Sequence, residues 1–443
     1  MGQKGRDGAQ AGDPEPPKGN ADTVRTRASA VNLRRVIGIL GPGIITGAAD
    51  DDPSGIATYS QTGAQFAYGQ LWTAFWMLPM LTAVQEACGR MGHVTGQGLA
   101  AVIKSRYNHR ALRTLVTLLL IANVINIGAD IGAVAASEHL VVPLPSAALA
   151  VLFTAVLLVV EIWFSYRRYA RVLKWLTLAL LAYPATAFLV TEPWARITHA
   201  TFVPHVQLSS SFFYVLTAVV GTTISPYMFF WQTSQEVEER RSAASGRSLL
   251  DVRLDNVVGM FNSQLVAWFI IVVGATVLHS GGVTTVKSAA DAASALRPLV
   301  KTFPHSGEVA QGLFAFGITA LGMLAVPVLA GSAAYAVSEA RGWPEGLDLK
   351  PKAGRNFYGI LAVAMVLGLT FNVFGVNPVA ALVFAAVVNA VVAVPLLWVL
   401  LRLSSDYALM GEARSRWLSQ SLLAVTLLGV TASALGAIVP LIR

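Results

Sequence analysis

The feature that most constrains the fold is a succession of long apolar segments separated by short polar connections. A helix needs about 20 mostly apolar residues to cross the hydrocarbon core of a bilayer. Eleven segments are close to that length or longer, and each is predicted to be a membrane-spanning helix. The chain is therefore predicted to be an all-α integral membrane protein. The segments lie at about 38–67, 70–92, 112–138, 146–165, 172–191, 210–232, 255–279, 309–338, 357–375, 378–401 and 418–440.

Composition excludes several other classes of protein. The chain is 55% hydrophobic and only 13% charged, which is too few charges for the surface of a soluble protein of 443 residues. Its net charge of +8 is spread between the apolar segments and forms no patch for nucleic acid. A single cysteine, Cys88, rules out an intramolecular disulfide and a cysteine-based metal site. With no Walker A, zinc or catalytic-triad motif, we expect no enzyme activity, no cofactor and no obligate protein partner.

The distribution of basic residues predicts the orientation in the membrane. The N-terminal tail and the even-numbered connections carry clusters of Lys and Arg, whereas the odd-numbered connections hold only Arg196, Lys287, Arg297 and Lys301. Because cytoplasmic loops carry the excess of positive charge, the N-terminus is predicted to be cytoplasmic and the chain a multi-pass protein of the inner (plasma) membrane. Residues 1–34, rich in Gly, Ala, Pro and charge, are predicted to form a disordered cytoplasmic tail before a transmembrane domain at 35–443.

The first apolar segment contains three consecutive carboxylates, Asp50, Asp51 and Asp52. Placing one charged carboxylate inside the bilayer costs roughly a few kcal/mol of free energy or more, unless the group faces a cavity, an ion or a partner. Pro53 and the Ser54-Gly55 pair predict that the helix is broken at 51–55. Since broken membrane helices place free carbonyls and helix ends at binding sites, the stretch predicts a cation site. The alternative is a loop between two shorter helices with a solvated acidic run.

The sixth segment is interrupted in a similar way near 222–227, where Thr222, Thr223 and Ser225 precede Pro226. The two interruptions are five helices apart, and a repeat with an odd number of helices must run through the membrane in opposite directions. Paired broken helices in two inverted halves indicate a transporter site. The predicted repeats are about 36–192 and 208–402, with an extra helix at 418–440. The alternative for the second interruption is an ordinary proline kink.

These segments resemble the Nramp family of divalent-metal transporters over most of the eleven-helix region. The resemblance implies a LeuT-type fold of two inverted five-helix repeats, with broken helices 1 and 6, plus one helix. The matching residues are Gly41-Pro42-Gly43, Asp52-Pro53, Ala57-Thr58, Gly63, Phe66 to Gly69 and Leu71-Trp72, then Gln85, Arg90, Gly92, Val94 to Gly96 and Leu99-Ala100.

The chain departs from the family pattern at the site itself. The family's Asp-Pro-Gly-Asn reads Asp52-Pro53-Ser54-Gly55 here, so Asp52 keeps the coordinating carboxylate and Gly55 replaces the coordinating Asn. The family's Met-Pro-His reads Ser225-Pro226-Tyr227, so Ser225 stands in place of the metal-binding thioether. A thioether favours transition metals, whereas an all-oxygen and wider site suits a partly hydrated Mg²⁺ ion. In these respects the chain is most similar to the Nramp-related magnesium transporters.

Several of the groups that usually relay protons in the family are also replaced in this chain. Tyr227 replaces a His, and Asn123 and Ala133 stand where two Glu residues are usual in the third helix. None of the three replacements titrates near neutral pH. The sequence therefore predicts a transporter that favours Mg²⁺, also accepts Mn²⁺ and needs no proton coupling. The alternatives are a proton-coupled Mn²⁺/Fe²⁺ importer and a sodium-coupled transporter of organic solutes.

The candidate residues fall into two groups, and several of them have a structural alternative. Ser and Thr hydroxyls can satisfy the backbone of a broken helix, Tyr227 can simply pack, and Asn389 can bond a neighbouring helix. For Asp130 the alternative is an ion pair with Arg355 or Lys352. Asp50 shares the site with Asp52 if the backbone there is extended. The predicted metal site comprises Asp52, Ala49 through its carbonyl, Gly55, Thr222, Ser225 and Tyr227, and the predicted pathway or gating residues are Asp50, Asp51, Thr223, Asp130 and Asn389.

Overall fold

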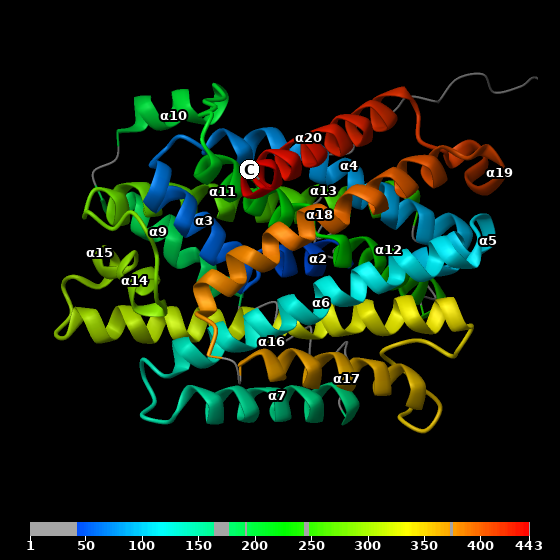
Figure 1. Ribbon diagram of the computed structural model, residues 1–443, viewed down its shortest axis with the longest axis horizontal. Coiled ribbons are helices and arrows are strands. Elements are labelled where there is room, and N and C mark those ends of the chain that lie inside the picture. The colour runs from blue at the N-terminus through cyan, green and yellow to red at the C-terminus, as the bar shows by residue number, and fades with distance from the viewer. Residues whose placement is uncertain (1–41, 164–176, 191–192, 243–247, 373–374, 443) are drawn as a thin grey trace, which may run out of the picture. The chain divides into compact units, whose positions relative to one another are not determined.

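A computed structural model describes residues 42–163, 177–190, 193–242, 248–372 and 375–442, and within these ranges every regular element is a helix (Figure 1). The predicted tail at 1–34 and the first residues of the predicted segment 38–67 lie outside the described residues.

Among the described residues, seven helices are long and apolar enough to cross a membrane. Two of these spans are composite. One joins α11 to α12 across the interruption in the sixth segment, and the other joins α13 to a π-helical turn, η2 at Gly274–His279. The helices are α6 (His109–Glu138), α7 (Ser146–Trp163), α11 (Ser210–Thr223) with α12 (Pro226–Ser242), α13 (Leu249–Val273), α16 (Ser306–Arg341), α18 (Pro378–Ser405) and α20 (Trp417–Ile442).

Shorter or more polar helices occupy the other predicted segments. The predicted segment 172–191 is only partly within the described residues, as a 3-10 turn at Thr177–Leu181 followed by α9. The helices are α2 (Pro42–Asp50), α3 (Pro53–Phe66), α4 (Trp72–Thr95), α9 (Ala182–Leu189) and α17 (Arg355–Phe371). The connections contain α5 (Leu99–Arg106), α10 (Trp194–Phe202), α14 (Ala289–Ser294), α15 (Arg297–Val300) and α19 (Tyr407–Met410).

Both interruptions are shorter than predicted. The helix resumes at Pro53 after the first one and at Pro226 after the second, so the expectation that Ser54 and Gly55 lie in the break was wrong. The physical reason is that proline suits the first turn of a helix, where its missing N–H has no partner to lose. Asp52, extended at φ −63° and ψ 173°, caps the new helix by accepting a hydrogen bond from the Gly55 N–H.

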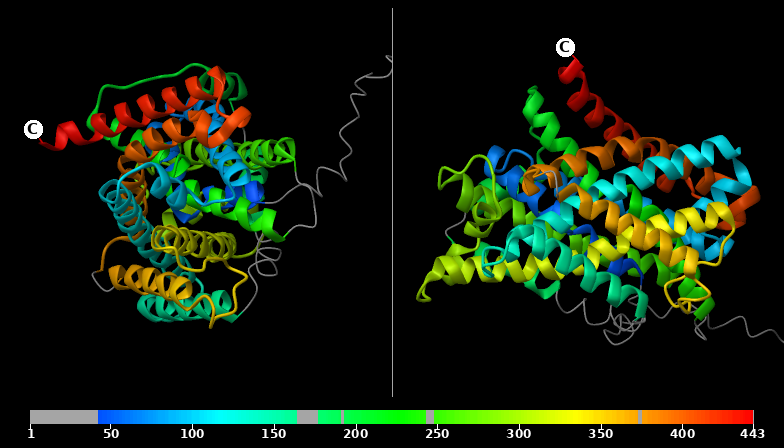
Figure 2. Two further views of the ribbon diagram at one scale, coloured as in Figure 1. Left: turned by 90° about the vertical axis from the view of Figure 1, so that its right-hand side faces the viewer. Right: turned by 60° about the horizontal axis from the view of Figure 1, so that its bottom comes forward.

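The interrupted first helix lies in the middle of the bundle, with α13 against both of its halves and α6 and α16 packed together beside it (Figures 1 and 2). Glycines allow the backbones to touch. A Cβ on Gly47 of α2 would lie 2.3 Å from the Gly259 carbonyl oxygen, and one on Gly63 of α3 would lie 2.4 Å from that of Ile271. The two halves of the first helix are therefore held against the same continuous helix.

Candidate metal centre

The first interruption presents two oxygen donors at its edges. Ala49, next to last in α2, has a carbonyl with no helical partner inside its own short helix, and Asp52 follows across the break. One oxygen of the Asp52 carboxylate, Oδ1, accepts the Gly55 N–H at 2.7 Å. The other, Oδ2, points at the sixth helix.

At the second interruption, side-chain hydroxyls already donate hydrogen bonds to backbone carbonyls of α11. The Ser225 hydroxyl contacts the Gly221 and Thr222 carbonyls of α11, both at 2.8 Å, and the Thr223 hydroxyl donates to the Val219 carbonyl at 2.8 Å. These hydroxyls therefore compensate for the loss of helical hydrogen bonding at the break. A cation that takes the Thr222 carbonyl has to compete with Ser225.

Tyr227 joins the two interruptions. Its hydroxyl lies 3.1 Å from the Ala49 carbonyl oxygen and 3.4 Å from Asp52 Oδ2. Because the hydroxyl has one proton, it can donate to only one of these acceptors at a time. A carbonyl and a carboxylate from the first helix thus converge on one point, where a cation would be attracted to both.

Two further contacts fix the halves of the first and sixth helices in register. The Ser54 hydroxyl lies 3.1 Å from the Thr222 hydroxyl, and the Tyr59 hydroxyl lies 2.9 Å from the Thr223 hydroxyl. Both contacts bring α3 against α11, so Thr222 and Thr223 lie beside the centre with their side chains engaged.

Asp50 and Asp51 face the seventh predicted span. Asp50 is the last residue of α2, so its backbone is helical and not extended as the shared-site hypothesis required. Ser263 of α13 donates to Asp50 Oδ2 and lies 3.5 Å from Asp51 Oδ1. The remaining oxygen of each carboxylate has no hydrogen-bond partner among the described residues.

Asp130 of α6 is fully buried, and neither of its carboxylate oxygens has a hydrogen-bond or ion-pair partner in the described part of the chain. The structural alternative for Asp130, an ion pair with Arg355 or Lys352, is therefore absent there. Nearby in the same helix, Asn126 donates to the Asn389 side chain of α18 at 2.8 Å. Asn389 thus makes a hydrogen bond between α18 and α6, which was the structural alternative to a role in the pathway.

The centre is closed in this structure. Asp50, Asp51, Asp52, Thr222 and Ser225 are each at most 2% exposed. A mainly apolar cavity of about 250 Å³ reaches Pro53, the neighbour of Asp52, from the end of the bundle where α14 and the start of α18 lie. In the described ranges no three His, Cys, Asp or Glu side chains are placed to hold a metal ion together. Any ion bound here would therefore need backbone, hydroxyl or water oxygens besides Asp52.

Three residues that the structure places at or near the centre, Ser263, Tyr59 and Gln232, were not predicted from the sequence. Ser263 contacts Asp50, Tyr59 contacts Thr223, and Gln232 of α12 accepts a hydrogen bond from Thr46 of α2. In the sequence, Ser263 could have been singled out because it lies in a polar run, Asn262-Ser263-Gln264, within an apolar segment. That signal does not say which helix the side chain faces.

Comparisons with known proteins place the chain in a family. The family model described as "Natural resistance-associated macrophage protein-like", Nramp, matches residues 43–440. The chain therefore belongs to the Nramp family, whose members are membrane transporters and not enzymes.

Curated relatives match along most of their length. "Divalent metal cation transporter MntH 1" of Pseudomonas aeruginosa is 28% identical over 442 residues, covering 94% of each chain. "Divalent metal cation transporter MntH" of Aeromonas hydrophila is 25% identical over 414 residues, covering 90% of this chain and 96% of its own.

Solved structures support the fold. The manganese transporter of Eremococcus coleocola, in complex with an aromatic bis-isothiourea substituted compound, has a TM-score of 0.72 at 16% identity and covers 95% of this chain and 88% of its own. Mhp1, a nucleobase-cation-symport-1 family transporter, has a TM-score of 0.55 at 12% identity, covering 90% of this chain and 92% of its own. The chain is thus an all-helical, multi-pass membrane protein with a LeuT-type fold.

Proposed function

We propose that the chain transports divalent metal cations by alternating access around its two interrupted helices. The observation that carries the proposal is the convergence of the Ala49 carbonyl and the Asp52 carboxylate on the Tyr227 hydroxyl. Family membership and the relatives' names as divalent metal cation transporters support it. Thr222 and Ser225 add oxygen donors, Gly55 supplies the N–H that orients Asp52, and Thr223, Asp50, Asp51, Asp130 and Asn389 belong to the pathway.

The donor set favours Mg²⁺, with Mn²⁺ also accepted. Both groups that the Tyr227 hydroxyl contacts are oxygens, and Ser225 offers a hydroxyl in place of a soft sulfur ligand. Mg²⁺ binds few carboxylates and keeps several waters, which fits a centre with one fixed carboxylate, Asp52. A membrane potential negative inside favours entry by about 2.3 kcal/mol per charge per 100 mV, so that uptake needs no proton.

The second candidate is a proton-coupled Mn²⁺/Fe²⁺ importer, and the comparisons favour it. The relatives are MntH proteins and the similar solved structure is a manganese transporter. Asp130 is the residue that would carry the proton, because it is buried without a partner in the described ranges. A sodium-coupled transporter of organic solutes has only the fold likeness to Mhp1 behind it.

For the topology we propose eleven spans, two inverted five-helix repeats at about 36–192 and 208–402, an extra helix at 418–440, and a cytoplasmic N-terminus in the plasma membrane. Contacts between basic connections support this orientation. Arg106 lies 3.6 Å from Asp406, and Arg240 donates to the His93 carbonyl. The second, sixth and tenth connections therefore meet at one end of the bundle, as the positive-inside rule requires of cytoplasmic loops.

Ion influx into proteoliposomes tests the proposal. The change is Asp52→Asn, which removes the charge but keeps a residue that caps helices well. The matched control is Glu308→Gln, the same acid-to-amide change at an exposed position in the first turn of α16. We expect saturable Mg²⁺ influx in the wild type and in the control, and none in Asp52→Asn.

Two measurements distinguish the magnesium transporter from the proton-coupled manganese importer. Mn²⁺ influx without Mg²⁺ influx would give first place to the manganese importer, and acidification of the lumen during Mn²⁺ influx, reported by a trapped pH dye, would show its proton coupling. Influx of either ion at wild-type rate through Asp52→Asn would refute the placement of the centre.

A further inference from the structure

A second polar site lies at the end of the bundle where α4, α13 and α20 meet. A cavity of about 720 Å³ opens there, within the size range of small-molecule sites. It lies at the end of the bundle that is predicted to be cytoplasmic. Its charged lining residues are Glu86, Arg90, Arg253, Glu412, Arg414 and Arg416, so four arginines face two glutamates.

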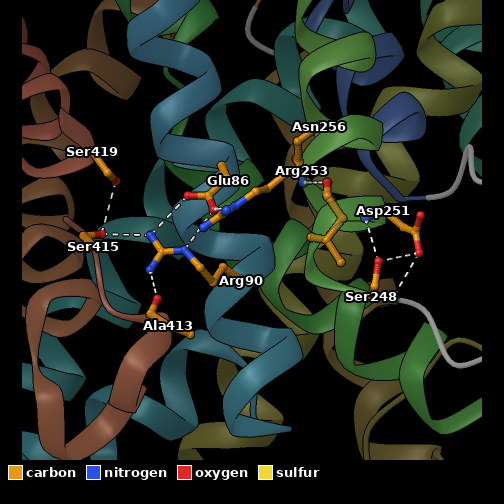
Figure 3. A network of polar contacts seen from close by, with 10 residues as sticks. Glu86, Arg90, Ser248, Asp251, Arg253, Asn256, Ala413, Ser415 and Ser419 are labelled. Carbon is orange, nitrogen blue, oxygen red and sulfur yellow. Dashed lines mark hydrogen bonds and ion pairs between the residues drawn. The ribbon is translucent and has the colours of Figure 1, made fainter. Parts of the chain in front are cut away.

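One arginine forms the wall of the cavity and is already neutralised. Arg90 is 1% exposed and is held by both oxygens of Glu86, at 2.9 and 3.1 Å, and by the Ala413 carbonyl and the Ser415 hydroxyl (Figure 3). This network fixes the start of α20 against α4. It leaves the other arginines as the source of the site's net positive charge.

The remaining arginines supply the positive charge that an anion in the cavity would meet. Arg253 donates through its Nε to the same Glu86 oxygen, Oε1, that accepts from Arg90 Nε, at 2.9 Å, and its side chain is 54% exposed (Figure 3). Arg414 stacks over Tyr407 with its guanidinium 5.3 Å from the ring centre, and Arg416 is exposed. Guanidinium groups bind phosphate oxygens in a two-pronged geometry, so three of them around one cavity match a phosphate group.

Apolar side chains continue from the cavity along the outer surface of two spanning helices. On α13 they are Leu250, Leu254, Val257 and Phe261, at helical spacing and each more than 40% exposed. On α20, Trp417 and Leu418 line the cavity itself, and Val425 and Leu428 follow them on the exposed surface. In a membrane these two stripes face the acyl chains, directly beneath the arginines.

We infer that this cavity binds the phosphate headgroup of an anionic phospholipid, with the acyl chains lying along the exposed faces of α13 and α20. Charge complementarity and the continuity of the basic cavity with membrane-facing apolar surface favour a lipid over a free phosphate ion. Basic pockets between membrane helices at the cytoplasmic side bind anionic headgroups for this reason. The inference does not depend on which ion is transported.

Lipid titration by native mass spectrometry tests the inference on the delipidated full-length protein. The variant is Arg414→Gln with Arg416→Gln, and the matched control is Arg110→Gln with Arg113→Gln, which removes two exposed charges from α6 at the same end of the bundle. Each basic side chain near an anionic membrane surface contributes roughly a factor of five to affinity. We therefore expect binding of phosphatidylglycerol to weaken about thirtyfold in the variant and by less than about threefold in the control.

Phosphatidylcholine and inorganic phosphate are the comparison ligands, with thermal unfolding measured on the same samples. We expect phosphatidylglycerol to raise the unfolding temperature of the wild type and the control, and the other two ligands to leave it unchanged. Equal weakening in variant and control, or equal binding of phosphatidylcholine, would overturn a specific site. Stabilisation by inorganic phosphate at the same concentration would assign the cavity to a free anion instead. Arg253→Gln, at a second edge of the cavity, should weaken the lipid as well, and unchanged affinity in both variants would reject the site.

Discussion

Replacing Tyr227 with Phe gives a sharp test of the centre, because it removes one hydroxyl between two acceptors. In the closed structure that hydroxyl is 3.1 Å from the Ala49 carbonyl oxygen and 3.4 Å from Asp52 Oδ2. An intramolecular hydrogen bond contributes about 0.5–1.5 kcal/mol net, and leaving a buried acceptor unpaired costs about 1–3 kcal/mol. The metal-free variant should therefore lose about 1–2 kcal/mol of stability.

The same change should strengthen cation binding. A cation held by both acceptors has to displace the hydroxyl, so the wild type binds it with a free energy reduced by the value of that hydrogen bond. About 1.4 kcal/mol corresponds to a factor of ten, so Tyr227→Phe should bind Mn²⁺ and Mg²⁺ about tenfold more tightly. Isothermal titration calorimetry on the purified protein measures this affinity, and thermal unfolding with and without metal measures the stability.

The matched control is Tyr59→Phe. Tyr59 is also buried, at 1% exposure, and its hydroxyl bonds Thr223 at 2.9 Å without contacting Asp52. The control should lose similar stability and keep wild-type affinity. If Tyr227→Phe binds metal more weakly than the wild type, the hydroxyl, or a water it holds, is a ligand and the displacement reasoning is refuted.

Two further changes test the packing and the titration of the bundle. Gly221→Ala should destabilise the protein by about 1–3 kcal/mol and abolish transport, because its Cβ would lie 1.9 Å from the Ala386 carbonyl oxygen. The control is Gly429→Ala, whose Cβ would have no atom within 4 Å. Thermal unfolding and influx are measured for both variants, and equal effects would contradict the reasoning. Burial raises the pKa of Glu345 to about 7 from its ordinary value of 4.5, so the neutral form is favoured in the fold and the free energy of unfolding should fall as pH rises from 4.5 through 7. Glu345→Gln should remove that part of the pH dependence of thermal unfolding, and an unchanged slope would exclude Glu345 as its source.

The positions of the helices and of both interruptions could be predicted because each rests on local chemistry. Apolar length specifies a spanning helix, and Pro53 and Pro226 each lack the backbone N–H that a continuous helix would use at that position. The meeting of Asp52 with Tyr227 followed from pairing the two interruptions across inverted repeats. The extent of each break was misjudged, since both prolines begin a helix and do not merely end one.

The partners of individual polar side chains could not be predicted from one sequence. The contact of Asp50 with Ser263 and that of Asn126 with Asn389 depend on the rotation of each helix about its axis. That rotation is fixed by close backbone approaches, such as Gly47 against Gly259, between residues far apart in the chain. The missing ion pair of Asp130 has the same cause, because its helix turns the carboxylate inward among buried residues.

The attachment of both halves of the first helix to α13 restricts how the protein can open. Gly47 of α2 and Gly63 of α3 touch the backbone of one uninterrupted helix, so the two halves cannot swing apart like independent arms while these contacts last. Opening toward one side of the membrane must either bend α13 or carry α2, α3 and α13 together as one body. The π-helical turn at Gly274–His279 lies where α3 meets α13, since a Cβ on Gly274 would be 3.1 Å from the Ser60 carbonyl oxygen. Bending at that turn would alter the contact with α3, while the contact of Gly47 with Gly259 would keep α2 in place.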